Sequence, residues 1–125
     1  MDEYDPLEAP DAAEWLALDE SERIELVVKY HQRAREELPN LRLHAAMHAI
    51  VENQVALGDE IPVRRTLARL EAEGLNRHEA VHAVGSVLAE YMYHAIKGGA
   101  PAGDPNQRYW AALDKLSARK WRRAR

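Results

Sequence analysis

Four of the six histidines in this chain form two pairs with the same spacing. His44 and His48 are four residues apart, and so are His78 and His82. Residues four apart lie one above the other on the same side of a helix, so each pair can present two imidazole rings to one ion. Neutral imidazole is a common ligand of divalent transition metals. The two pairs therefore predict a metal site.

Glu52 continues the first pair by another four residues. It would add an oxygen ligand one turn further along, or support the histidines as a hydrogen-bond partner. Imidazole suits Zn, Fe and Ni, and a carboxylate also suits Mn, so we expect one of these four as a divalent cofactor. The chain has no Cys, which excludes thiolate ligands. The predicted metal ligands are His44, His48, Glu52, His78 and His82.

The second pair also matches the H-E-x-x-H pattern of zinc proteases, in which the Glu acts as general base. However, Glu79 stands three residues after Asn76 and can close a capping box at a helix start. A substrate-binding strand beside the motif is not expected either. A small zincin-like metallohydrolase is therefore the weaker alternative, and no catalytic residue is assigned.

Two other histidines lie outside the pairs. His31 ends the apolar face of its helix and could reach the same core, but a structural role is favoured for it. Glu90 and His94 are four residues apart on the polar side of their helix. We interpret them as a solvated pair, with Glu90 as a reserve ligand.

Helix signals cover the chain, and strand signals are missing. Helix starts are predicted at Asp11, Asp19, Asn40, Pro62, Asn76 and Asp104-Pro105. Helix ends are predicted near Pro39, Gly58, Gly74 and Gly98-Gly99. We expect one all-α domain over residues 1–125, an irregular bundle of four main helices plus shorter ones, with residues 1–10 flexible.

The spacing alone does not bring the two pairs together. Their helices, the third and the fifth, should run parallel if the fourth forms a hairpin between them. Each pair lies beside the apolar row of its helix, so the pairs need not face each other. One shared site, two separate sites and a site across a homodimer interface all remain open.

Composition narrows the function classes. The formal net charge of −4 argues against a nucleic-acid partner, and we interpret the basic C-terminal end as a solvated tail. No apolar run approaches the roughly 20 residues of a membrane span, and no secretory signal is seen, so we expect no membrane association and a cytoplasmic location.

A metal-free protein-interaction module is the alternative from a different class. In it the histidines would be structural, and exposed aromatic side chains would form a contact surface. Aromatic residues at helical spacing belong more often to a core, which weakens this reading. The candidates are Trp15, Tyr109, Trp110 and Trp121.

Several segments together resemble a bacterial family, domain-of-unknown-function family 1841. They are residues 43–54 (LHAAMHAIVENQ), 62–64 (PVR), 70–74 (LEAEG) and 78–82 (HEAVH), followed by Glu90. The resemblance covers about residues 40–117. It implies that the histidine pattern is shared, which favours metal binding, but it brings no activity. Asp can stand at the position of Glu79 in this family, which argues against a general base there.

Overall fold

The computed structural model describes residues 1–98 and 105–124, in which every regular element is helical. The elements are α1 (Ala12–Ala17), α2 (Glu20–Arg33), α3 (Leu41–Ala56), the short 3-10 helix η1 (Gly58–Glu60), α4 (Val63–Ala72), α5 (Arg77–Gly98), α6 (Pro105–Lys115) and α7 (Ala118–Ala124). The described residues contain no strand, which confirms the predicted all-α bundle. The expected cap at Asp104 lies outside the described residues.

Local capping explains where the helices begin. Asp19 and Glu22 form a reciprocal capping box at the start of α2, and Asn76 and Glu79 form the same pair of hydrogen bonds before α5. Gly74 follows α4 with φ +108°, a conformation that side chains rarely allow. The predicted starts of α2 and α5 therefore rest on hydrogen bonds that the structure contains.

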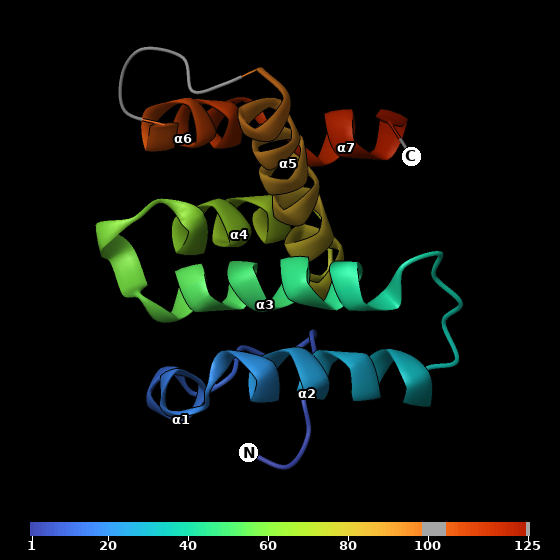
Figure 1. The fold of residues 1–125 in the computed structure, drawn as a ribbon. Coiled ribbons are helices and arrows are strands. Elements are labelled where there is room, and N and C mark those ends of the chain that lie inside the picture. The colour runs from blue at the N-terminus through green and yellow to red at the C-terminus, as the bar shows by residue number, and fades with distance from the viewer. Residues whose placement is uncertain (99–104, 125) are drawn as a thin grey trace.

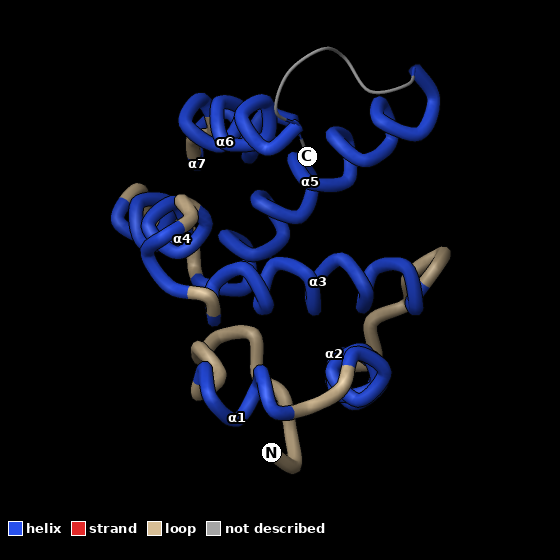
Figure 2. Tube along the Cα trace, turned by 60° about the vertical axis from the view of Figure 1, so that its left-hand side comes forward, coloured by secondary structure: helices blue, strands red, loops and turns tan. Residues whose placement is uncertain are grey.

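The helices are stacked in layers (Figure 1). α2 runs antiparallel to α3 on one side, and α4 packs beside α3 on the other. α5 crosses α3 steeply and rises away from it, as Figure 2 also shows, and α6 packs against α5. The predicted parallel course of α3 and α5 is therefore wrong. The tight turn after α4 directs α5 across α3 instead of along it.

Two apolar clusters form the core. The larger one joins α3, α4, α5 and α6, and the smaller one joins the N-terminal segment, α1, α2 and α3. Trp15 and Tyr109 belong to these clusters and are 0% and 2% exposed, so neither can serve in a contact surface. At about 100° per residue, His48 lies between Val51 of the larger cluster and Ala45 of the smaller one on α3.

Both ends of the chain pack against the bundle. Tyr4 and Pro6 are buried, and Arg77 donates to the Pro6 carbonyl at 3.0 Å. The basic C-terminal end is not a free tail, because it forms α7, buries Ala118, and donates from Arg122 to the Gly74 carbonyl. Among the described residues, no helix combines the length and apolarity that crossing a bilayer requires.

Candidate metal centre

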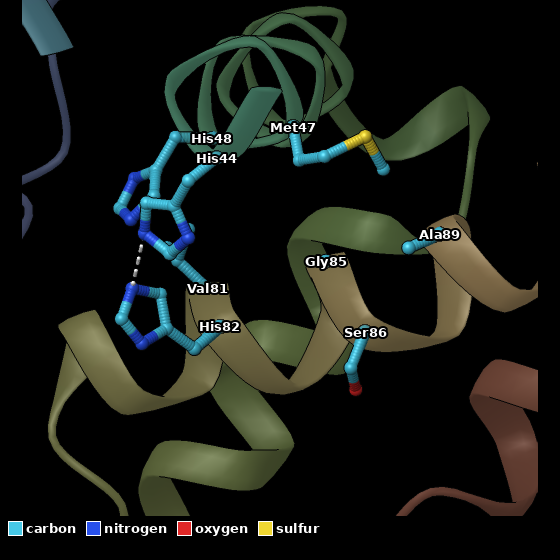
Figure 3. Close-up of a pocket in the computed structure, with 8 residues that line it drawn as sticks. All are labelled: His44, Met47, His48, Val81, His82, Gly85, Ser86 and Ala89. Atoms are coloured by element: carbon cyan, nitrogen blue, oxygen red, sulfur yellow. Dashed lines mark hydrogen bonds between the residues drawn. The ribbon is translucent and has the colours of Figure 1, made fainter. Parts of the chain in front are cut away.

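The two histidine pairs converge where the start of α5 crosses α3. Nε2 of His44 lies 3.2 Å from Nε2 of His82, and Figure 3 shows the two rings pointing toward each other. The ring centroids of His48 are 5.3 Å and 4.9 Å from those of His78 and His82. The steep crossing therefore brings the pairs together within one chain.

His31 joins this cluster from α2. Four ring nitrogens lie within 4.8 Å of one another, one each from His31, His48, His78 and His82. His31 is completely buried, and its ring lies edge-on to those of His44 and His48. Sequence reasoning favoured a structural role for His31. Its position at the end of an apolar face was a signal, but the pairing of α2 with α3 was needed to use it.

Backbone geometry fixes the proton on His31. Its Nδ1 lies 2.9 Å from the Val27 carbonyl oxygen. A carbonyl only accepts hydrogen bonds, so Nδ1 carries the proton and Nε2 keeps a free lone pair. Metal-binding histidines are commonly held in this way by a backbone carbonyl.

A buried chain of polar groups also determines which ring nitrogen of His48 carries the proton. Arg77 forms a bidentate ion pair with Glu52, with distances of 2.7 and 2.8 Å. The Tyr4 hydroxyl donates to Glu52 and lies 3.1 Å from Nδ1 of His48. Since the single hydroxyl proton points to Glu52, the Tyr4 oxygen accepts from Nδ1–H, and Nε2 of His48 keeps its lone pair.

Three histidine nitrogens in the cluster are buried and make no hydrogen bond. They are Nε2 of His31, His48 and His78. The Glu36 carboxylate lies 3.9 Å from Nε2 of His31, which is too far for a hydrogen bond. Buried polar atoms are almost always paired, so these three nitrogens need a partner.

Burial favours the neutral form of three rings in the cluster, those of His44, His48 and His78. Desolvation, and then the neighbouring histidines, lower the pKa of His48 far below its usual value. Desolvation is also the main cause that lowers the pKa of His44 and His78. Burial, followed by the charge of Glu52, raises the pKa of the Tyr4 hydroxyl, so it stays protonated. Neutral rings are the form that binds metal.

A match to a family model identifies the family of this chain. The model of a domain of unknown function, DUF1841, matches residues 12–115. The chain belongs to the DUF1841 family. A search of curated proteins found no match, and a search of solved structures found none either. In this DUF1841 protein the matched span contains all five clustered histidines, whereas Tyr4 precedes it.

In this DUF1841 protein, Glu52 lies in an ion pair with Arg77 and not among the four clustered histidine nitrogens. One oxygen accepts from Arg77, and the other accepts from both Arg77 and Tyr4. It reaches His48 only through Tyr4. The arrangement fits the supporting role that the sequence left open for Glu52, because both carboxylate oxygens are already engaged.

The H-E-x-x-H match has a structural explanation in the DUF1841 fold. The backbone N–H of Asn76 donates to Glu79 at 3.0 Å, which closes the capping box. No strand lies beside the motif within residues 1–98 and 105–124. Glu90 and His94 are 3.9 Å apart and exposed, as expected for a solvated pair.

Proposed function

We propose that this DUF1841 protein binds one divalent transition-metal ion inside the histidine cluster. His31, His48, His78 and His82 are the ligands, and His44 lies at the edge of the same site. The supporting observation is the set of three buried Nε2 atoms without hydrogen bonds. Leaving one buried polar atom unpaired costs about 1–3 kcal/mol, and a shared ion would satisfy all three.

The distances are compatible with this role. Zn–N bonds are about 2.0–2.1 Å long, so two nitrogens of a tetrahedral site are about 3.3–3.4 Å apart. The four nitrogens of the cluster lie within 4.8 Å of one another, so the most distant pair must close by about 1.4 Å. The 3.2 Å between His44 and His82 is close to the separation of neighbouring ligands.

The donor set narrows the choice of ion. Because Glu52 is engaged by Arg77 and Tyr4, the site offers imidazole nitrogens without that carboxylate. This removes the main argument for Mn and favours Zn, Ni or Fe(II). Such an ion could activate water or serve storage or sensing.

The test is metal content. We expect untagged native protein to contain one equivalent of metal by elemental analysis, or to take it up with a rise in melting temperature. His48→Ala and His82→Ala should each lose it, because both pairs contribute to one site. His94→Ala is the matched control, since His94 is exposed and outside the cluster. No stoichiometric metal and no thermal shift with Zn²⁺, Ni²⁺, Mn²⁺ or Fe²⁺ would contradict the proposal.

A further inference from the structure

A pocket of about 310 Å³ opens beside the histidine cluster, between α3 and α5. His44, His48 and His82 line one end of it (Figure 3). From there it follows α5 along Gly85 to Ala89. Ala89 lies seven positions after His82, which corresponds to about 10 Å of helix. The pocket is therefore long enough for a chain of several carbon atoms.

Gly85 keeps this pocket free. Glycine is among the least favourable residues inside a helix, and Gly85 lies well within α5. A Cβ atom there would meet only Val51 Cγ2 at 3.9 Å, an ordinary contact. No close backbone approach therefore requires glycine at this position. A larger side chain would instead take up pocket volume.

The two parts of the pocket differ in chemistry. Along α5 the wall is formed by Val81, Gly85, Ser86 and Ala89, and the Ser86 hydroxyl donates to the Ala83 carbonyl. The flexible side chain of Met47 lies across from them on α3. This part suits an apolar chain, and Met adapts to irregular shapes. The other end is formed by histidines. Among the residues that the structure describes, no acidic side chain lines the pocket.

Charge balance indicates what the histidine end would bind. Neutral imidazoles leave the full double charge on an ion, and a buried unbalanced charge is unfavourable. The charge of Glu52 is balanced by Arg77. Glu36 lies 3.9 Å from His31, and its charge also acts on His44 and His78, but it does not line the pocket. An anion entering from the pocket would compensate the ion.

We propose that the pocket binds a small carboxylate with an unbranched apolar tail. This rests on the proposed metal site. The carboxylate binds the ion as a fifth ligand beside His44 and His82, and the tail lies along α5 next to Gly85. The proposal thus adds a ligand class to the metal centre.

The test uses the full chain loaded with Co²⁺, which imidazole sites accept and which has a visible spectrum sensitive to its ligands. Metal content is measured first. Acetate, butyrate, hexanoate and 1-hexanol are then titrated by calorimetry and absorption. We expect the affinity of the acids to rise about fourfold for each buried methylene. Hexanoate should change the Co²⁺ spectrum, and 1-hexanol should not.

Variants locate the tail. Gly85→Leu should lower hexanoate affinity at least tenfold and leave metal content and acetate binding unchanged. Gly85→Ala, a smaller change, should give a smaller loss. Ala95→Leu places the same side chain at the exposed end of α5 and should change nothing.

The outcomes separate the two proposals. Failure of the protein to hold metal overturns both of them. Bound metal with an affinity independent of chain length overturns the pocket proposal alone. So does hexanoate affinity that is unaffected by Gly85→Leu and Gly85→Ala, or 1-hexanol binding as tight as that of hexanoate.

Discussion

The Tyr4 hydroxyl lies 3.1 Å from Nδ1 of His48 and thereby determines which ring nitrogen carries the proton. The Tyr4 hydroxyl donates its hydrogen bond to Glu52, whose negative charge is paired with Arg77. His48 must then donate from Nδ1, and its Nε2 lone pair faces the other histidines. A residue near the N-terminus thus sets the chemical state of a ring in the middle of the fold.

Removing this hydroxyl should weaken metal binding without abolishing it. We expect Tyr4→Phe to lower metal affinity about 10–100-fold, as is typical when a hydrogen-bond partner of a ligand is lost. Competition with a chelator of known affinity measures this. Tyr109→Phe is the matched control, because Tyr109 is equally buried and donates to Gln54 at 2.8 Å. Equal losses in both variants would contradict the role of Tyr4.

The sequence predicted the fold class and most helix starts because these depend on local signals. Asp19, Asn40 and Asn76 each cap the helix that was expected to follow them. The two histidine pairs were also visible as spacing within single helices. Each of these features needs only residues a few positions apart in the sequence.

The rest of the site depends on contacts that spacing cannot reveal. Tyr4 meets His48 across 44 positions, and Arg77 meets Glu52 across 25. The steep crossing of α3 and α5 follows from the turn around Gly74, and no periodic pattern records such an angle. His31 could only be placed once α2 was known to pack on α3. Tertiary packing therefore determines which polar residues are in contact.

Glu52 should matter more for stability than for ligation. Glu52→Ala leaves the buried Arg77 guanidinium without its partner, which is expected to lower the free energy of unfolding by about 3–5 kcal/mol. Urea denaturation measures this. Metal binding should weaken but persist, whereas His48→Ala should abolish it. Glu25→Ala is the control, because the pair of Glu25 with Arg42 is exposed and should contribute little. Complete metal loss in folded Glu52→Ala would instead favour direct ligation.

Glu79 should act as a helix cap and not as a base. We expect Glu79→Gln to be nearly neutral, since Gln also closes a capping box. Asn76→Ala should lower the free energy of unfolding by about 1 kcal/mol, because its side chain accepts from the Glu79 backbone. Neither change should alter metal content. A peptidase activity that disappears in Glu79→Gln while the metal stays bound would restore the zincin interpretation.

Metal-free protein should lose stability in mild acid. Burial lowers the pKa of His48, so this ring stays neutral in the folded state, whereas in the unfolded chain it takes up a proton near pH 6.5. Below that pH the unfolded state binds more protons, and the free energy of unfolding falls as the pH decreases. His48 alone should contribute up to about 1.4 kcal/mol per pH unit.

Urea denaturation of chelator-treated protein between pH 7 and pH 4.5 measures this dependence. Other groups titrate in the same range, so the informative quantity is the difference between native protein and His48→Leu. The slope should be shallower in His48→Leu and unchanged in His94→Ala, because His94 is exposed. Identical slopes for the native chain and His48→Leu would contradict the assignment.

Replacing His31 should separate the effect on metal binding from the effect on folding most clearly. Its Nε2 is buried without a hydrogen bond, so the metal-free protein gains nothing from that nitrogen. His31→Leu keeps an apolar side chain of similar bulk, and the Val27 carbonyl retains its helical partner. Replacing an unpaired polar group by an apolar one should raise the free energy of unfolding of metal-free protein by up to about 2 kcal/mol.

Metal affinity of His31→Leu should fall at least about 100-fold, because one of four ligands is lost. Chelator competition and urea denaturation of the same sample measure both effects. A destabilised metal-free protein with unchanged metal affinity would show that His31 has a purely structural role.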